Sequence, residues 1–317
     1  MPKLLSSVTA MPFASPIRRA LTGHWRRRLA MLMLAVAAVA GIAPAASAED
    51  SSPAALREKH AALGDKLKNN QFQRALYLES FESPNSLKGD IFAVVDYPFA
   101  TVNTALNNQK HWCDVLILHL NIKYCKEGGD AAAPLLSVNL GKKNQQALTD
   151  TYHVTFKYRA EISDPDYFSV ILSASEGPLN TTDYRIHLET VALDATHSFL
   201  HLTYSYSYGF AGKMAMKTYL ATTGSDKIGF TSSDGAGDKP TYVKGVRGVV
   251  ERNTMRYYLA IDAYLSAMNA PASEQFEKRI QSWFSATERY SRQLHELDRD
   301  AYLDMKRAEY QRQNAAQ

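Results

Sequence analysis

The chain has 317 residues and a formal net charge of +4 at pH 7, from 36 lysines and arginines against 32 aspartates and glutamates. The first 48 residues hold one lysine, five arginines and no acidic residue. The remaining segment of about 269 residues therefore has a net charge of about −2, which gives no indication of a nucleic-acid partner. Its length is sufficient for one large domain with its own hydrophobic core.

The first 48 residues have the three parts of an export signal. A basic start (Arg18, Arg19 and Arg26–Arg28) precedes the apolar run Leu29–Ile42, and Ala46–Ala48 offers small residues for cleavage before Glu49. The run is too short to span a membrane. We expect cleavage after Ala48 and export to a bacterial periplasm by the general secretory route. The paired arginines leave the twin-arginine route open, and Met11 is an alternative start.

The sequence contains two cysteines, Cys113 and Cys125. In an oxidising compartment such a sole pair is expected to form a disulfide, with two free buried thiols as the alternative. A metal site is disfavoured, because the spacing is not CxxC and His111 and His119 form no ligand pattern with the pair. The sequence also lacks GxSxG, HExxH, a phosphate-binding glycine loop and a Rossmann fingerprint. We therefore assign no catalytic residue, no metal and no cofactor.

The first half of the mature chain alternates turn residues with strand-like runs. Ser52 and Pro53 begin a helix that extends to about Asn70. Phe99–Leu106 begins a short helix that runs towards Trp112. Strands that form an antiparallel meander are predicted at Arg74–Phe81, Leu87–Tyr97, Leu116–Tyr124, Leu135–Leu140, Thr151–Ile162, Tyr167–Ser175, Tyr184–Leu193 and Ser198–Tyr208.

Helices dominate the last third of the sequence. Gly209–Lys239 is a mixed segment with a helical patch, and apolar residues then recur at intervals of three and four from Val246 to Met268. On this long helix Glu251, Arg252 and Arg256 are interpreted as an exposed ion-pair face, supported by the i,i+4 pair of Arg247 and Glu251.

A last helix is predicted from Pro271 to about Arg312. Its apolar residues form a near-heptad seam, for which the N-terminal helix is the expected partner and a homodimer through the C-terminal helix is the alternative. The seam residues are Phe276, Ile280, Trp283, Thr287, Tyr290, Leu294 and Leu297.

The order of these elements resembles the START-like, helix-grip superfamily. The resemblance rests on GDIFAVVDYPFATVNTALNNQKHW at Gly89–Trp112, on HLETVALDATHSFLHLTYSYSYG at His187–Gly209 and on the closing helix from Val246. This superfamily includes plant pollen allergens, polyketide cyclase-like proteins and lipid-transfer domains. The resemblance implies an α+β fold in which a curved antiparallel sheet wraps around a long C-terminal helix and encloses an apolar cavity.

We accordingly expect four segments in the chain. Residues 1–48 form the signal peptide, 49–75 an N-terminal helix, 76–270 the START-like domain and 271–317 a C-terminal helical extension.

Tyrosines concentrate on one face of the strand Ser198–Tyr208. Because side chains alternate along a strand, Leu200 and Leu202 share that face with the tyrosines. A cavity wall is one interpretation, and a core whose hydroxyls reach its rim is the other. The expected ligand-binding residues here are Tyr204, Tyr206, Tyr208, Asn253, Tyr257 and Tyr264.

Arg185 is a further candidate, for a polar ligand head, and its role depends on strand register. If Leu193 pairs with Ser198, then Arg185, His187 and Glu189 share the tyrosine face. A one-residue slip moves all three to the opposite face.

The expected function is binding or transfer of a hydrophobic, lipid-like small molecule between sheet and long helix, with the segment 209–240 covering the entrance. A cyclase-type enzyme that uses His187 or Tyr257 for proton transfer is the first alternative. A non-catalytic envelope interaction protein, with a cavity filled by side chains, is the second.

Overall fold

The computed structural model describes residues 51–222, 224–233 and 241–315. The predicted signal peptide lies outside these residues. Within the described ranges, no helix combines the length and the apolar character that crossing a bilayer requires.

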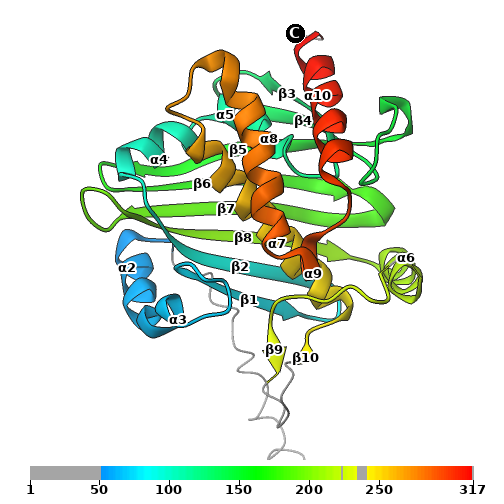
Figure 1. The fold of residues 1–317 in the computed structure, drawn as a ribbon, viewed down its shortest axis with the longest axis horizontal. Helices are drawn as coiled ribbons and strands as arrows, with labels where there is room; N and C mark the ends of the chain where they lie inside the picture. The colour runs from blue at the N-terminus through cyan, green and yellow to red at the C-terminus, as the bar shows by residue number, and fades with distance from the viewer. Residues whose placement is uncertain (1–50, 223, 234–240, 316–317) are drawn as a thin grey trace, which may run out of the picture. The chain divides into compact units, whose positions relative to one another are not determined.

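One eight-stranded antiparallel sheet forms the framework (Figure 1). Its order is β1-β2-β8-β7-β6-β5-β4-β3, so the first hairpin lies beside the last strand and β1 and β3 form the edges. A separate two-stranded ribbon pairs β9 (Ser232–Ser233) with β10 (Thr241–Tyr242). The strands of the large sheet are β1 (Leu76–Glu82), β2 (Ser86–Val95), β3 (Ile122–Gly129), β4 (Pro134–Leu140), β5 (Tyr152–Asp164), β6 (Tyr167–Gly177), β7 (Thr181–Ala192) and β8 (Ser198–Tyr208).

The long helix α7 (Gly245–Ser266) crosses one face of this sheet, which we call the inner face (Figure 1). Gly245 begins the helix with φ +67°, a conformation that favours glycine. At Gly89 of β2, an added Cβ would lie 2.3 Å from the Thr254 hydroxyl oxygen, so this glycine allows helix and sheet to approach closely. The predicted architecture, a curved antiparallel sheet around a long C-terminal helix, is confirmed.

Two short helices, α4 (Phe99–Leu106) and α5 (Gln109–Leu116), connect β2 to β3. Cys113 of α5 and Cys125 of β3 form the predicted disulfide, with 5.2 Å between their Cα atoms. The predicted strand at Leu116–Tyr124 is wrong in its first half, because β3 begins only at Ile122.

The C-terminal helix α10 (Arg299–Ala315) explains the late start of β3. The Tyr302 hydroxyl donates to the Leu118 carbonyl at 3.0 Å, and the Lys306 ammonium donates to the His119 and Ile122 carbonyls at 2.8 and 3.0 Å. The Leu118 and His119 carbonyls, which precede β3, are therefore bonded by side chains of α10, and the His119 carbonyl also accepts from the Ile122 amide at 3.0 Å.

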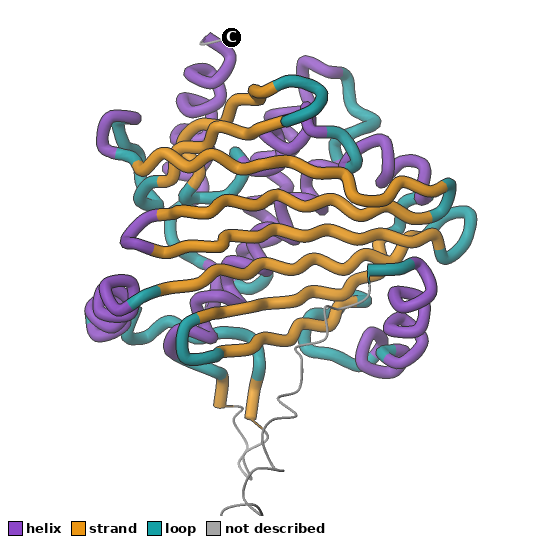
Figure 2. The backbone as a smooth tube through the Cα atoms, turned by 180° about the vertical axis from the view of Figure 1, so that it is seen from behind, coloured by secondary structure: helices purple, strands orange, loops and turns teal. Residues whose placement is uncertain are grey.

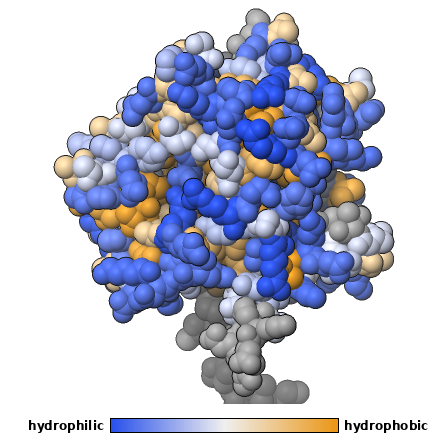
Figure 3. Space-filling view, viewed as in Figure 1, coloured by the Kyte–Doolittle hydropathy of each residue, from blue (hydrophilic) through white to orange (hydrophobic). Residues whose placement is uncertain are grey.

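The predicted single helix from 271 to 312 is wrong, because it is divided into α8 (Ala272–Glu288), α9 (Ser291–Leu294) and α10. The break follows from Tyr290, whose backbone is non-helical and whose hydroxyl donates to the Phe72 carbonyl at 3.0 Å. Ile280 and Trp283 of the seam are buried within the same chain, where α8 packs on α7. The face of α8 and α10 is mostly hydrophilic, with hydrophobic residues in separate patches (Figure 3).

The N-terminal helices α2 (Pro53–Ala62) and α3 (Gly64–Lys68) do not pack on that seam, contrary to expectation. Leu56, Leu63 and Leu67 cluster with Phe92 and Phe199 on the outer face of the sheet. Seen from behind, these helices occupy one lower corner of the sheet (Figure 2). The predicted boundaries at 75/76 and 270/271 stay a prediction.

We expect Glu309→Gln to lower the free energy of unfolding by roughly 3–5 kcal/mol. Glu309 lies between Lys123 and Lys306 at 3.0 and 2.7 Å, and all three side chains are at most 2% exposed. The substitution leaves two buried ammonium groups without a carboxylate. Urea unfolding measures the change.

Glu274→Gln is the matched control, since Glu274 pairs with Lys278 at 2.8 Å and both side chains are 54% exposed. It should change the free energy of unfolding by less than about 1 kcal/mol. Equal effects of the two substitutions would contradict a structural role for the buried cluster.

Candidate functional site

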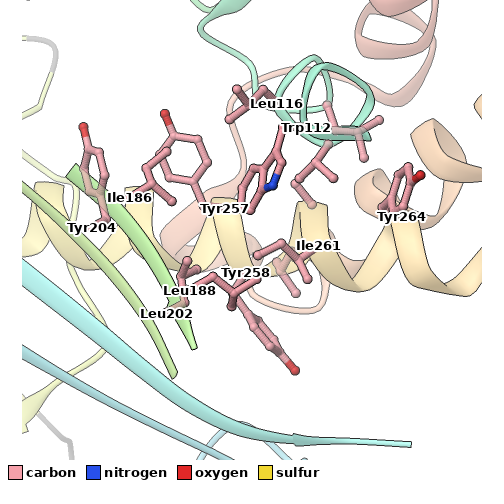
Figure 4. Close-up of a cluster of buried hydrophobic side chains, with 14 of the residues drawn as sticks. Trp112, Leu116, Ile186, Leu188, Leu202, Tyr204, Tyr257, Tyr258, Ile261 and Tyr264 are labelled. Carbon is pink, nitrogen blue, oxygen red and sulfur yellow. The ribbon is translucent and has the colours of Figure 1, made fainter. Parts of the chain in front are cut away.

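The inner face carries a row of tyrosines along β8, as expected from the alternation. Tyr204 lies beside Tyr257 of α7, with 5.1 Å between ring centroids, and Tyr206 stacks on Tyr184 at 5.3 Å. Figure 4 shows Tyr204 and Tyr257 next to each other within the buried cluster. Burial raises the pKa of Tyr204, Tyr206 and Tyr257, so these side chains remain neutral phenols. The middle of the sheet–helix interface is therefore a packed aromatic core.

Two cavities lie at one end of the interface between the sheet and α7, where helix α6 (Phe210–Ala221) covers the start of α7. The first has a volume of about 300 Å³, and its lining includes Leu87, Tyr206, Tyr208, Leu220 and Val246. The second has a volume of about 250 Å³, and its lining includes Asn121, Lys143, Val249, Arg252, Asn253 and Arg256. Both cavities also contact Thr181, Gly212 and Met216, so Met216 of α6 lies where they adjoin.

The candidate residues from the sequence are distributed unequally around these cavities. Tyr206 and Tyr208 line the first cavity and Asn253 lines the second. Tyr204 and Tyr257 lie in the aromatic core. Tyr264 lies about two turns further along α7 (Figure 4), where its ring contacts His111 and the Arg279 guanidinium. The structure thus brings Tyr206, Tyr208 and Asn253 to the two adjoining cavities and leaves Tyr264 apart from them.

The pairing of Leu193 with Ser198, on which a role for Arg185 depends, does not occur, and the register is the alternative one, shifted by one residue. The observed partner of Ser198 is Ala192, and Arg185 pairs with Ser205. The cause is the turn, in which the amides of Leu193 and Asp194 both donate to the His197 carbonyl. The turn therefore begins one residue earlier than expected, and Arg185 lies on the outer face with His187 and Glu189. Its predicted contact with a ligand on the tyrosine face is not possible from there.

On the outer face, a buried polar network surrounds His201. Its ring nitrogens lie 2.9 Å from Asp90 Oδ1 and 3.0 Å from Glu189 Oε2, and the Tyr167 hydroxyl donates to Glu189 at 2.6 Å. Burial lowers the pKa of His201, but hydrogen bonds to both carboxylates outweigh it and raise the pKa to about 9. In the described parts of the chain, no group of three histidine, cysteine or acidic residues is arranged to hold a metal ion. The network joins side chains of four adjacent strands, β2, β8, β7 and β6.

The predicted exposed ion-pair face of α7 is wrong as well. Glu251, Arg252 and Arg256 are 0, 2 and 2% exposed. Glu251 accepts hydrogen bonds from the backbone amides of Phe230 and Thr231 at 2.6 and 2.9 Å. These partners precede Glu251 by 21 and 20 residues in the sequence, and they cover this side of the helix.

The cationic wall of the second cavity was missed by the sequence analysis. Arg252 donates to the Ile228 carbonyl, and Arg256 bonds the Leu294 carbonyl and Glu296. Asn253, which falls on the apolar stripe of α7, is the one sequence feature that indicates a polar cavity there. Nothing in the local sequence around Lys143 does so.

The structure has the curved antiparallel sheet and the long C-terminal helix that the sequence resemblance implies. The fold is a helix-grip fold. No protein-family model matches the chain, and no curated protein matches it.

Similar solved structures include human STARD10, with 7% identity, a TM-score of 0.32, and coverage of 52% of this chain and 75% of that one. The Zhui aromatase/cyclase from Streptomyces sp. R1128 has 11% identity, a TM-score of 0.28, and coverage of 44% and 74%. A conserved protein from Geobacillus kaustophilus has 13% identity, a TM-score of 0.30, and coverage of 44% and 84%. Such values bear on neither ligand nor reaction.

We expect His201→Gln to destabilise the protein most at low pH. The folded-state pKa of about 9 lies above the ordinary value of 6.5, so protonated His201 contributes its full stabilisation below pH 6.5 and loses it as the pH rises through 9. The difference in unfolding free energy between wild type and variant should shrink over this range by at most roughly 3 kcal/mol.

Urea unfolding at several pH values between 6 and 9.5 measures this difference. His153→Gln, at an exposed histidine of β5, serves as the control and should cost little at any pH. A wild-type advantage over His201→Gln that stays constant with pH would rule out a charged His201.

Proposed function

We propose that the protein binds or transfers a hydrophobic, lipid-like small molecule in the two cavities beneath α6. The observation that carries this proposal is their arrangement around Met216, where sheet, α6 and α7 meet. Each cavity is at or below the lower end of the range for small-molecule sites, about 300 Å³. A methionine side chain is flexible, so its movement would join them into one site. Burial of apolar ligand surface, at about 25 cal/mol per Å², would drive binding.

Helix α6 is the proposed entrance cover, in agreement with the expectation for the segment 209–240. Phe210 at its start is 82% exposed, and neighbouring Leu179 is 67% exposed. Leu179 also has φ 61°, a left-handed conformation that a leucine rarely adopts. Strained backbone of this kind is found where a segment changes conformation for function.

A cyclase-type enzyme is the second candidate, and Lys143 is the observation in its favour. Burial and the neighbouring Arg256 charge lower the pKa of Lys143 to about 8, which is suited to proton transfer near neutral pH. The residues named for this role from the sequence are less suitable. His187 lies on the outer face bonded to Ser169, and the raised pKa of Tyr257 makes it a weak acid. Binding is therefore the better-supported function.

The proposed location is the periplasm. The disulfide between Cys113 and Cys125 supports an oxidising compartment. A homodimer through the C-terminal helix has less support, because Ile280, Trp283 and Leu294 of the seam are already buried within one chain.

We expect the exported protein to begin at Glu49. Expression of the full chain in a Gram-negative host, fractionation and N-terminal sequencing test both location and cleavage. A chain that retains residues 1–48, or one confined to the cytoplasm, would contradict the proposal.

We expect Met216→Trp to weaken binding of the neutral dye Nile red at least about tenfold. The indole would fill the space where the two cavities adjoin and remove apolar area from the ligand contact. Fluorescence titration measures the affinity, and mass spectrometry of an organic extract of the wild type identifies a co-purified ligand.

Met214→Trp is the matched control, since Met214 lies on the same helix, is 47% exposed and lines neither cavity. It should bind the dye within about twofold of wild type, and circular dichroism verifies that both variants fold. Unchanged binding by Met216→Trp would place the ligand elsewhere.

A further inference from the structure

A third cavity lies on the outer face of the sheet, on the opposite side from α7. Its volume is about 760 Å³, within the range of about 300–1,000 Å³ that is typical of small-molecule sites. Its lining residues come from β5, β6 and β7 and from residues 131–135, at the turn between β3 and β4. Figure 2, which views the molecule from behind, shows no helix in front of the middle of these strands. The cavity is therefore open to a ligand from this side.

A row of paired residues crosses this cavity. Lys157 of β5 pairs with Ser173 of β6, and Ser173 pairs with Arg185 of β7. Directly paired residues in an antiparallel sheet lie on the same face, with their Cβ atoms about 4.5–5.5 Å apart. Ser173 therefore lies between two cationic side chains that are long enough to reach over its hydroxyl group. Within the described parts of the chain, no residue forms an ion pair or a hydrogen bond with any of these three side chains.

The lining of this cavity contains three cationic residues and no carboxylate. The third cation, Arg159, pairs with Glu161. Asp130 precedes the residues of the turn, and its carboxylate accepts hydrogen bonds from two backbone amides of that turn at 2.8 and 2.9 Å. Among the described lining residues, Lys157 and Arg185 are thus the cations that have no carboxylate partner.

The charge of Arg185 also acts on its neighbour on the outer face. Burial lowers the pKa of His187, which is two residues further along β7. The charge of Glu189 opposes this shift, and the charge of Arg185 adds to it. The guanidinium group is therefore a source of positive potential on the outer face.

We propose that this third cavity binds a small organic anion, whose carboxylate or phosphate group is held over Ser173 by Lys157 and Arg185. The guanidinium group can bind either anion in bidentate geometry, the ammonium group adds a second charge, and the serine hydroxyl donates a hydrogen bond. Leu135 pairs with Lys157, so the uncharged segment 131–135 borders the anion and would contact the organic part of the ligand. This site shares no lining residue with the two cavities beneath α6 and is independent of the proposed function.

The test is isothermal titration calorimetry of the full mature chain with four probes: phenyl phosphate, benzoate, benzyl alcohol and inorganic phosphate. We expect the two organic anions to bind at least about tenfold more tightly than benzyl alcohol, because only they carry a charge that the two cations attract. Lys157→Met and Arg185→Gln should each weaken binding of the organic anions about fivefold or more. Lys157 is exposed, so its substitution should leave the fold intact, and circular dichroism verifies this for both variants.

Lys142→Met and Arg289→Gln are the matched controls, since both residues are exposed and line none of the three cavities. Both should bind all four probes as wild type does. The affinity for Nile red should be the same in wild type and in all four variants, which separates this site from the cavities beneath α6.

Anion binding that is unchanged in both Lys157→Met and Arg185→Gln would overturn the proposal, because the anion would then bind elsewhere. Equal binding of benzoate and benzyl alcohol would overturn it as well. Inorganic phosphate that binds as tightly as phenyl phosphate would overturn the organic ligand and identify a free anion as the occupant.

Discussion

The close approach of α7 to the inner face of the sheet is the constraint on which the rest of the structure depends. It requires a residue without a side chain at Gly89, opposite Thr254. It also requires Tyr204 of β8 to pack against Tyr257 in the middle of the helix, and Tyr258 and Ile261 beyond it are buried. The first turns of α7, around Val246 and Val249, face α6 and the cavities instead. One helix thus forms both the packed core and the proposed binding site.

Three cationic residues at this side of the protein, Lys306, Lys143 and Arg256, have different surroundings. Lys306 donates to two backbone carbonyls and to Glu309, so its hydrogen-bonding capacity is fully used by the fold. It lines neither of the two cavities, and its role is to attach α10 to β3. Lys143 and Arg256 share a carboxylate and also border open volume. The distinction between a structural and a ligand-binding cation rests on that volume, not on burial alone.

Local patterns in the sequence predicted most of the fold. Alternation along β5 to β8 and the three–four periodicity of α7 are properties of short windows, and the observed elements agree with them within a few residues. The disulfide was predictable because only one cysteine pair exists. Contacts between distant segments were not predictable in this way. Glu251 and Arg256 resemble surface residues in the sequence, and only residues 228–231 and 294–296, which fold over α7, explain their burial.

The candidate site shows the same contrast between what short sequence windows predict and what contacts between distant segments decide. Tyr206, Tyr208 and Asn253 were found because strand and helix periodicity assigns them to the interior. Arg185 was misplaced by a single residue of register, which the hydrogen bonds of the turn at Asp194 decide. Lys143 was missed because it lies in a loop, where no periodicity relates it to the cavity. Periodicity therefore predicted the apolar wall of the site and not its charged end.

The separation between the tyrosines of the first cavity and the arginines of the second has a consequence for how a ligand would orient. The tyrosines of the inner face have raised pKa values and remain neutral, so they offer an apolar surface with isolated hydroxyls and no net charge. Arg252 and Arg256 are among the residues that line the second cavity, beyond Met216. A neutral apolar molecule would have no preferred direction along such a surface, because dispersion and area burial are non-directional.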